Sequence, residues 1–388
     1  MSHTMTATKR RVCFVTGTRA EFGLMRRALR AVQSHPNVHL QLIVTGMHLD
    51  ARHGHTIDDI RRERWRIDAT VPWRAAAKDP DATAASTGLA IAGLARAFAK
   101  LNPDVVLVVG DRVEAFAAAA AAHVGQRAVA HVHGGDKAQG QVDDALRHAI
   151  TKLAHLHFPA TRRSAARIKR LGEVPANIHV VGAPGLDGIE GEPLTLAELR
   201  AIVPDLRRHL FALLVLHPDD PSDQLAFDRA TMLLRASERI GFERLVIVAP
   251  NNDPGAAGTF RAWDRAAKRP NVSLHRDLPR RAFLALLRDA AVLAGNSSAG
   301  IVEAASFGTP VVNVGPRQLG RERSKNVTDV PWTETAIRRA LVKVWNRGRP
   351  VRFTGRNVYG DAGAGERIAA ILGRVPLDGA LRRKLIAY

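Results

Sequence analysis

Short apolar runs alternate with helix-spaced apolar positions along the first 110 residues of the chain. Residues 11–16 and 38–45 are β-branched and apolar, which predicts two strands, and residues 21–34 between them carry apolar positions at helical spacing. Residues 101–110 are continuous and valine-rich, as strands buried on both faces of a parallel sheet are. Strands that alternate with helices predict right-handed βαβ units in a doubly wound parallel sheet.

The same pattern continues to residue 133 and restarts in the second half of the chain. Residues 114–123 predict an alanine-rich helix and residues 128–133 the next strand. Gly182-Ala183-Pro184-Gly185 is a candidate hinge, and further strands are predicted after it at residues 211–216, 244–249, 272–274, 291–294 and 311–314. We therefore expect two α/β domains, residues 1–183 and 184–388, with a last helix near residues 365–372 that packs back on the first domain. Ligands are expected in a cleft between the domains, at the carboxyl ends of both sheets.

The chain carries a formal net charge of +20, from 57 basic and 37 acidic residues. Nucleic-acid-binding proteins usually gather such charge into a stripe or tail that also contains aromatic residues. Here aromatic residues make up 5% of the chain, arginines are spread from Arg10 to Arg383, and clusters such as Pro279-Arg280-Arg281 are typical of solvated helix faces. This favours a small anionic substrate over nucleic acid. A hydrophobic share of 46% excludes fibrous and wholly disordered proteins.

The single cysteine, Cys13, excludes a disulfide framework and a cysteine-built zinc site. Because it lies in an apolar run, we expect a buried side chain and not a reactive thiol. No segment is expected to reach the ~20 apolar residues of a membrane span, and residues 1–11 are polar without an apolar signal core. The sequence thus predicts a cytoplasmic protein without a membrane partner.

Polar residues follow each predicted strand of the first domain. Gly17-Thr18-Arg19 opens a helix, where free amides, the helix dipole and the charge of Arg19 suit a phosphate, although a simple tight turn is the alternative. Asp111 follows the valine-rich strand and is either functional or a helix N-cap. His131-Val132-His133-Gly134-Gly135-Asp136 follows the next strand. Its two histidines are expected on one strand face with no third metal ligand, and its glycines suggest close approach to a ligand.

Carboxylates from three places in the first domain are expected to converge. Asp111, Asp136 and the pair Asp143-Asp144 all lie near predicted strand ends, and Arg147 follows the pair on the next helix. Carboxylates that lie close together raise one another's pKa, so one residue type can supply both an acid and a base.

The second domain offers a histidine and a second anion-binding turn. His217 follows the strand at 211–216 and is either catalytic or structural. Gly295-Asn296-Ser297-Ser298-Ala299-Gly300 leads from a strand into a helix, with hydroxyls and amides for a phosphate. Glu303, one turn along, is either a ribose ligand or a solvated carboxylate. Arg317 and Arg321 follow the next strand and offer two more cations.

Taken together, these residues resemble the hydrolysing UDP-N-acetylglucosamine 2-epimerases of sialic and related nonulosonic acid biosynthesis. The resemblance runs in order through VTGTRAEFGLM, VTGMHL, GDRVEA, HVHGGD, DDALRHAITKLAHLHFPAT, GNSSAGIVEAASFGTPVVNVG and RQLGR. It implies two Rossmann-like domains in a glycosyltransferase-B-like fold, a UDP-sugar substrate, no metal or other cofactor, and a homodimer.

The resemblance also implies a reaction and its residues. Loss of the C2 proton and of UDP from UDP-N-acetylglucosamine would give a 2-acetamidoglucal, and water would add to it to release N-acetylmannosamine. By motif position, the catalytic residues implied are Asp111, Asp136, Asp143 and His217. The substrate- or nucleotide-binding residues implied are Arg19, Arg147, Asn296, Ser297, Ser298, Glu303, Arg317 and Arg321, with Glu303 on the ribose.

Two departures from the family pattern keep other substrates open. The family usually has glutamate where this chain has Asp136, and residues 360–365 differ from its usual sequence near the uracil. The alternatives are the same chemistry on a UDP-2,4-diacetamido-2,4,6-trideoxy sugar or a GDP-sugar, and a non-hydrolysing epimerase that adds UDP back. A glycosyltransferase would not need three acids in the first domain. Nucleic-acid binding is the alternative from a different class of protein.

Overall fold

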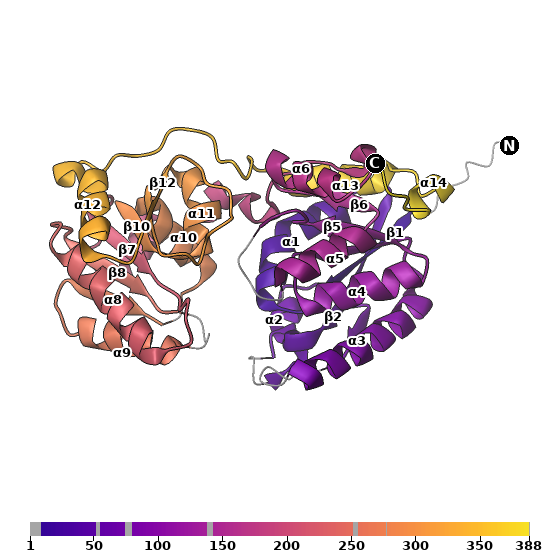
Figure 1. Cartoon of the computed structure of the whole chain (residues 1–388), viewed down its shortest axis with the longest axis horizontal. Helices are drawn as coiled ribbons and strands as arrows, with labels where there is room; N and C mark the ends of the chain where they lie inside the picture. Colours follow the sequence, from indigo (N-terminus) through magenta and orange to yellow (C-terminus); the bar gives the residue numbers. More distant parts are fainter. Residues whose placement is uncertain are drawn as a thin grey trace. The chain divides into compact units, whose positions relative to one another are not determined.

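The structure is a computed structural model of the whole chain and describes residues 9–51, 55–73, 80–137, 143–250, 255–276 and 278–387. The chain forms two compact units (Figure 1): Met1–Asp187 together with Tyr359–Tyr388, and Gly188–Val358. The division therefore falls at Asp187, and the end of the chain belongs to the first unit and not to the second.

The first unit is built on one parallel sheet. Its strands are β1 (Arg10–Thr16), β2 (Val38–Thr45), β3 (Ala69–Val71), β4 (Val105–Val109), β5 (Ala128–Val132) and β6 (Leu156–Phe158), in the order β3-β2-β1-β4-β5-β6. Its helices are α1 (Arg19–Ser34), α2 (Ile57–Arg62), α3 (Pro80–Leu101), α4 (Val113–Val124), α5 (Asp143–Leu153), α6 (Arg162–Arg170), α13 (Ala364–Arg374) and α14 (Gly379–Arg382).

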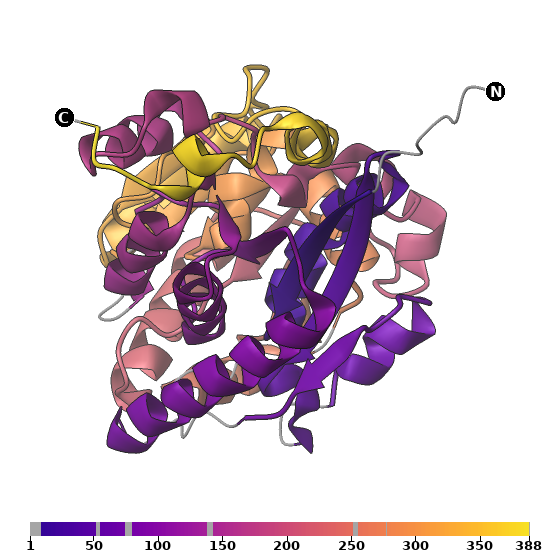
Figure 2. The same cartoon turned by 90° about the vertical axis from the view of Figure 1, so that its right-hand side faces the viewer.

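Helices cover both faces of this sheet (Figure 2), because alternate residues of each buried strand point to opposite sides. Val12 and Phe14 of β1 join the core that α1 and α13 complete, whereas Cys13 and Val15 face the core formed with α3, α4 and α5. Cys13 is fully buried, as predicted, and burial raises the pKa of its thiol.

The second unit repeats this architecture. Its strands are β7 (Phe211–Val215), β8 (Arg244–Val248), β9 (Val272–His275), β10 (Val292–Gly295), β11 (Val311–Val314) and β12 (Val327–Val330), in the order β12-β11-β10-β7-β8-β9. Its helices are α7 (Leu196–Arg200), α8 (Asp223–Glu238), α9 (Ala256–Ala266), α10 (Arg280–Asp289), α11 (Ser298–Val302) and α12 (Glu334–Trp345). Numbered within each unit, both sheets have the strand order 3-2-1-4-5-6, which is the doubly wound order.

The pattern-based prediction was wrong at the start of β4. The apolar run begins at Leu101, but α3 extends to Leu101 and the strand starts at Val105. Asn102 adopts a left-handed backbone (φ 45°) and Pro103 follows it, which ends the helix between the two elements. The short strands β3, β6 and β12 were not predicted.

Helix α3 also corrects the expectation about membrane spans. Among the described residues, Asp81–Leu101 is long and apolar enough to cross a membrane by length and composition alone. In the structure its inner side chains Ala90, Leu94 and Phe98 are buried in the core that it shares with α4. This long apolar helix therefore packs against the first sheet.

The chain returns to the first unit through α13. The backbone N–H of Ala183 donates to the carbonyl of Tyr359 at 2.8 Å, so the outgoing and returning segments are joined. The carboxylate of Asp187 accepts hydrogen bonds from the amides of Gly363, Ala364 and Gly365 at 2.7–2.8 Å, which satisfies the open N-terminus of α13. The helix then buries Ile368 and Leu372 in the first core.

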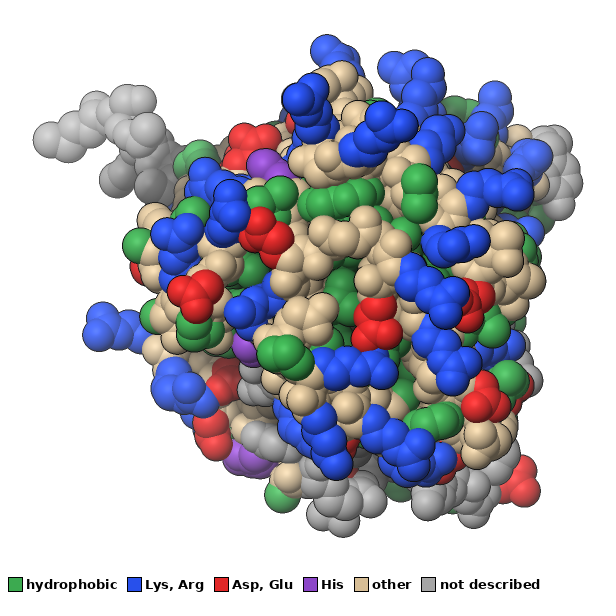
Figure 3. All heavy atoms as spheres, turned by 90° about the vertical axis from the view of Figure 1, so that its left-hand side faces the viewer, with side chains coloured by type: hydrophobic (Ala, Val, Ile, Leu, Met, Phe, Trp, Pro, Cys, Tyr) green, Lys and Arg blue, Asp and Glu red, His purple; other side chains and the backbone are tan. Residues whose placement is uncertain are grey.

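Basic side chains lie across the face shown in Figure 3, with acidic side chains among them. The +20 charge is thus not gathered into one stripe on this face.

Candidate active site

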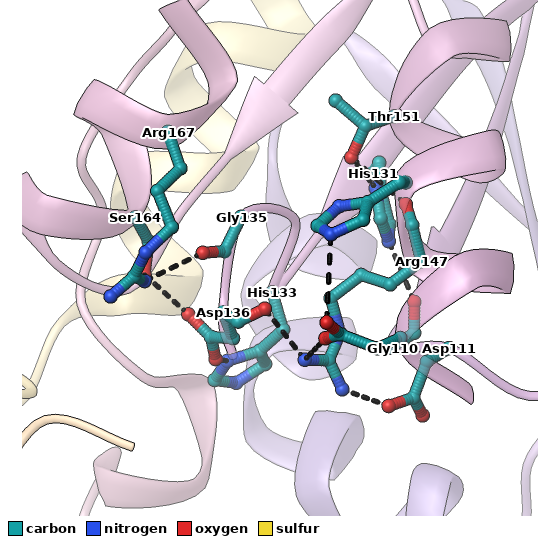
Figure 4. A network of polar contacts seen from close by, with 12 residues as sticks. Gly110, Asp111, His131, His133, Gly135, Asp136, Arg147, Thr151, Ser164 and Arg167 are labelled. Carbon is teal, nitrogen blue, oxygen red and sulfur yellow. Dashed lines mark hydrogen bonds and ion pairs between the residues drawn. The ribbon is translucent and has the colours of Figure 1, made fainter. Parts of the chain in front are cut away.

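The carboxyl ends of β4 and β5 bring the predicted acids of the first unit around Arg147 (Figure 4). The guanidinium of Arg147, on α5, pairs with the carboxylate of Asp111 and donates from Nη1 to the backbone oxygen of Asp136 at 2.7 Å. Its Nη1 also lies 3.6 Å from Oδ1 of Asp144. One buried cation therefore holds together the segments that follow two neighbouring strands.

In this geometry Arg147 pairs with acids of its own unit, and the substrate contact predicted for it stays a prediction. Its side chain is 6% exposed, and its charge balances acids of its own unit. A charge buried to this degree is costly unless it is paired, so Arg147 and Asp111 stabilise each other in place. The side chain of Asp143, the first residue of α5, lies outside the described residues, and its predicted role stays a prediction.

Asp136 is fixed by neighbours on both sides. Its Oδ1 accepts a hydrogen bond from the hydroxyl of Ser164 at 2.7 Å, and its Oδ2 lies 2.9 Å from Nδ1 of His133. Ser164 lies in the first turn of α6, where Thr161 caps the helix by accepting from the Ser164 amide at 3.0 Å. Ser164 was not predicted, because its contact with Asp136 joins residues 28 positions apart in the sequence.

The glycines of this turn serve close packing within the unit. Gly135 has φ 72°, and a Cβ placed on it would lie 2.3 Å from the backbone oxygen of Ser164. Only glycine therefore lets the turn approach α6 closely enough for Asp136 to meet Ser164. Arg167 of α6 fastens the same contact by donating to the carbonyl of Gly135 at 2.8 Å.

The two histidines of this motif do not share one face, contrary to the prediction. The strand ends at Val132, and His133 turns into the left-handed region with φ 62°. His131 is fully buried, with Nε2 2.7 Å from the carbonyl of Gly110 and Nδ1 3.4 Å from the hydroxyl of Thr151. Burial lowers the pKa of His131 to about 3, so its imidazole is neutral and fixes the backbone just before Asp111.

The amides of the Gly17-Thr18-Arg19 turn are already occupied. Oε2 of Glu21 accepts from the amides of Gly17 and Thr18 at 3.0 and 3.2 Å, in a capping box with Thr18. The prediction of open amides for a phosphate is therefore wrong here, because the chain supplies its own carboxylate. Burial, and then the nearby charge of Glu114, raises the pKa of Glu21 to about 7.

Arg19 itself is exposed at the start of α1 and lines a small pocket. This pocket has a volume of about 300 Å³ and is also lined by His48 and Thr56. Nε2 of His48 lies 3.1 Å from the hydroxyl of Thr16, and its Nδ1 lies 2.8 Å from that of Thr56. Burial lowers the pKa of His48 to about 4, so the pocket presents a neutral imidazole beside a cation.

In the second unit, His217 follows β7 and is held by Asn296, which follows β10. The side-chain oxygen of Asn296 accepts from the backbone amide of His217, and its Nδ2 donates to the carbonyl of His217, each at 2.8 Å. Asn296 is fully buried. Both ends of its amide group thus fix the backbone of His217, and the ligand contact predicted for Asn296 stays a prediction.

The loop after β11 contacts the backbone of Asn296. Gln318 donates from Nε2 to the carbonyl of Asn296 at 2.9 Å, and Nη1 of Arg317 lies 3.4 Å from that carbonyl. Ser297 caps the five-residue helix α11 by accepting from the amide of Ala299 at 3.3 Å. The other predicted binding residues nearby are Ser298, exposed at the first position of α11, and Arg321, part-buried in the loop.

Glu303, predicted to bind ribose, is paired with a residue that sequence reasoning assigned to a solvated face. Its Oε1 lies 2.9 Å from Nη1 of Arg280, at the start of α10, and Nε of Arg280 lies 3.3 Å from Oε2 of Glu192. Burial raises the pKa of Glu303, and the charge of Arg280 opposes this rise. No local motif marked Arg280, since the contact joins separate helices.

The chain thus consists of two doubly wound α/β units with acids, a histidine and cations at their strand ends. Residues 30–373 match the UDP-N-acetylglucosamine 2-epimerase family. The chain belongs to this family.

Curated relatives match this chain over most of its length. It is 36% identical over 386 residues, covering 98% of this chain and 100% of the relative, to the UDP-N,N'-diacetylbacillosamine 2-epimerase (hydrolyzing) of Legionella pneumophila. It is 31% identical to the UDP-N-acetylglucosamine 2-epimerase of Neisseria meningitidis, covering 88% of this chain and 89% of the relative. A GDP/UDP-N,N'-diacetylbacillosamine 2-epimerase (hydrolyzing) of Campylobacter jejuni is 30% identical, covering 83% and 84%.

Solved structures share the fold. The UDP-GlcNAc 2-epimerase of Neisseria meningitidis, bound to UDP-GlcNAc, has a TM-score of 0.78 at 20% identity and covers 93% of this chain and 99% of its own. The Methanocaldococcus jannaschii enzyme in complex with UDP-GlcNAc and UDP has a TM-score of 0.74 at 18% identity, with coverage of 93% and 99%. The two-domain fold implied by the sequence resemblance is thus confirmed.

Proposed function

We propose that this chain is a hydrolysing 2-epimerase of UDP-linked 2-acetamido sugars. The observation that carries the proposal is the cluster of Asp111, Asp136 and Asp144 around the buried Arg147, in a chain that belongs to the 2-epimerase family. Two relatives that match most of this chain are named as hydrolysing enzymes, which supports water and not UDP as the second reactant.

The proposed substrate is UDP-N,N'-diacetylbacillosamine, with UDP-N-acetylglucosamine as the second candidate. The relative at 36% identity carries the first name and the relative at 31% carries the second. Both sugars have an acetamido group at C2, so the same proton transfer at C2 serves either of them. The second candidate was the first choice on sequence alone, and the wider coverage of the Legionella relative changes the order.

The proposed reaction has two stages. The C2 proton is removed while the C1–O bond breaks and UDP leaves, which gives a 2-acetamidoglucal. Water then adds its hydroxyl to C1, and a proton returns to the opposite face of C2. In this proposal Asp111, Asp136 and Asp143 belong to the proton-transfer machinery. His217, Arg19, Ser297, Ser298, Glu303, Arg317 and Arg321 hold the nucleotide or support the leaving diphosphate. A homodimer stays part of the proposal.

A proton NMR time course in deuterated water tests this function. The full-length enzyme is incubated in parallel with UDP-N,N'-diacetylbacillosamine, UDP-N-acetylglucosamine and the corresponding GDP-sugar. Free nucleotide together with a C2-deuterated, C2-inverted free sugar is the expected result. An equilibrating pair of nucleotide sugars would show the non-hydrolysing reaction instead of hydrolysis. No reaction with any of the three substrates would overturn the proposal.

Matched variants connect the reaction to the cluster. We expect Asp111→Asn to abolish turnover and to leave UDP affinity within about threefold, since it removes an ionisable group and keeps the shape. Asp228→Asn, on the exposed face of α8, is the control and should retain full turnover. Equal activity in the two variants would show that Asp111 has no part in the chemistry.

A further inference from the structure

A histidine–carboxylate pair lies in the turn that follows β5 (Figure 4). Nδ1 of His133 lies 2.9 Å from Oδ2 of Asp136, and Oδ1 of the same carboxylate accepts a hydrogen bond from Ser164 at 2.7 Å. A carboxylate only accepts hydrogen bonds, so Nδ1 of His133 carries a proton, and in the neutral ring Nε2 presents a lone pair. The imidazole is therefore held in one tautomer.

The far nitrogen of this imidazole is unused. Within the described part of the chain, Nε2 of His133 is buried and has no hydrogen-bond partner. The residue also has a φ of 62°, in the left-handed region where residues other than glycine are uncommon. Buried polar atoms without a partner are rare in native proteins, and strained backbone gathers at functional sites. Both features occur here at one residue.

His131, two residues earlier, shows what a structural histidine looks like in the same motif. Both of its ring nitrogens face polar partners, the carbonyl of Gly110 and the hydroxyl of Thr151, and it lies in regular strand. His133 differs in each respect, since one nitrogen is unpaired and the residue stands beyond the strand. The contrast indicates a function for His133 that packing does not supply.

Asp136 is placed to orient this imidazole. Each of its oxygens faces a partner within the first unit, His133 on one side and Ser164 on the other. An aspartate in this position with a hydroxyl behind it holds a histidine in the same way as the carboxylate of a catalytic triad. The short side chain of Asp136, a departure from the family pattern, fits this orienting role.

We propose that Nε2 of His133, oriented by Asp136 and Ser164, takes the proton from C2 of the sugar. This inference rests on the proposed function. The nitrogen lone pair binds the C2 proton, and the C2–H electron pair becomes the second bond between C1 and C2. The C1–O bond breaks in the same step, and its electron pair leaves with the diphosphate of UDP. Asp136 is a positioning residue in this step, and the proton moves to His133.

Glutamine and glutamate at position 133 separate proton transfer from a structural role. Both side chains are unbranched and meet the same backbone strain. Glutamine can donate to Asp136 but cannot take a proton, whereas glutamate can take a proton but repels Asp136. We expect His133→Gln to lower turnover at least 1,000-fold. We expect His133→Glu to be at least tenfold more active than His133→Gln. A structural role reverses this order, because only glutamine preserves the contact with Asp136.

UDP affinity and fold are measured in the same variants. We expect both variants to bind UDP within about threefold of wild type and to keep the wild-type circular dichroism spectrum. His39→Gln, at an exposed position of β2, is the matched control and should retain full turnover. Retention of one tenth or more of wild-type turnover by His133→Gln, or activity of His133→Gln equal to or above that of His133→Glu, overturns the proposal.

If neither variant shows turnover, His133→Gly tests whether His133 transfers the proton. Glycine accepts φ 62° without strain and leaves space for free imidazole. Turnover restored in proportion to added imidazole supports the proposal, and absence of restoration overturns it. Release of UDP by the wild-type enzyme is measured first. If the wild-type enzyme releases no UDP, the proposed function is contradicted. If it releases UDP normally but the variants do not behave as expected, only the role of His133 is contradicted.

Discussion

The two units share one strand order, but they fix their candidate residues by different means. In each unit, polar residues follow the first and fourth strands of the sheet: Glu21 and Asp111 come after β1 and β4, and His217 and Asn296 after β7 and β10. In the first unit the residue after the fourth strand, Asp111, is held by an ion pair with Arg147. In the second the corresponding residue, Asn296, is a carboxamide hydrogen-bonded to the backbone of His217, at 2.8 Å on both sides.

This difference shows that topology sets the location of polar residues while their chemistry is set separately. A carboxylate held by an ion pair can still gain or lose a proton, and its environment shifts the pH at which it does so. A carboxamide bonded to backbone has no proton to exchange and can only fix geometry. The first unit is therefore suited to proton transfer, and the second to rigid presentation of a histidine and of amides.

Removal of the central cation of the first unit is expected to have the largest effect. Arg147→Met keeps the volume of the side chain and leaves Asp111 without its buried partner. Breaking a buried ion pair from one side costs about 3–5 kcal/mol. We expect a loss of this size in the free energy of unfolding, measured by urea denaturation, and a fall in turnover of at least about 100-fold, because small displacements of reacting groups are costly.

Arg163→Met is the control for this change, since Arg163 is exposed on α6 in the same unit. It should change the free energy of unfolding by less than about 0.5 kcal/mol. A similar small change in Arg147→Met would mean that the acids do not depend on their shared cation.

Removal of the carboxamide of the second unit is expected to have an intermediate effect. Asn296→Ala takes away both hydrogen bonds to the backbone of His217, which we expect to cost about 2–3 kcal/mol. Urea denaturation measures this loss, and titration with UDP shows whether the loop still presents its binding residues. Asn271→Ala, at an exposed position, is the control. A stability equal to wild type in Asn296→Ala would refute the positioning role.

Neutralising Glu21 is expected to have the smallest effect, and one that depends on pH. Burial raises the pKa of Glu21 from 4.5 to about 7, so the folded state binds this proton more tightly than the unfolded state does. Its contribution to stability is full below pH 4.5 and is lost as pH rises to 7. Glu21→Gln removes that loss, and its oxygen still accepts from Gly17 and Thr18.

We therefore expect the free energy of unfolding of Glu21→Gln, relative to wild type, to rise by about 1–3 kcal/mol between pH 5 and pH 8. Thermal or urea unfolding at the two pH values measures this difference. Glu366→Gln, exposed in the first turn of α13, should show no comparable change. His48 acts in the opposite direction: its pKa is lowered to about 4, so its contribution is lost as pH falls from 6.5 to 4 in both proteins.

The long buried strands could be predicted from the sequence because their signal is local. The boundaries of β2 and β11 agree with prediction to the residue, since valine- and isoleucine-rich runs mark them. The edge strands β3, β6 and β12 could not be predicted, because pairing with a neighbour defines them more than their own residues do. The start of β4 was misplaced because Leu101 is apolar and suits a helix or a strand.

The site could be predicted as a set of positions but not as a set of contacts. Asp111 and Asp136 were found because they follow strands, and the structure places the carboxylate of Asp111 and the backbone oxygen of Asp136 on one guanidinium. Ser164 and Arg280 were missed because each acts on a residue far away in the sequence. The occupation of the Gly17 and Thr18 amides by Glu21 was missed for another reason: the same G-T-R-x-E pattern suits a phosphate site and a capping box equally.

The Asp187 cap on α13 joins two separate stretches of the chain into the first unit, and this affects the order in which the units can fold during synthesis. The ribosome completes Gly188–Val358 before it makes the helix that buries Ile368 and Leu372. The second unit can therefore reach its native state while the first still exposes the apolar face of α1. A chain truncated after Val358 should thus carry a protease-resistant second unit beside a protease-sensitive first one.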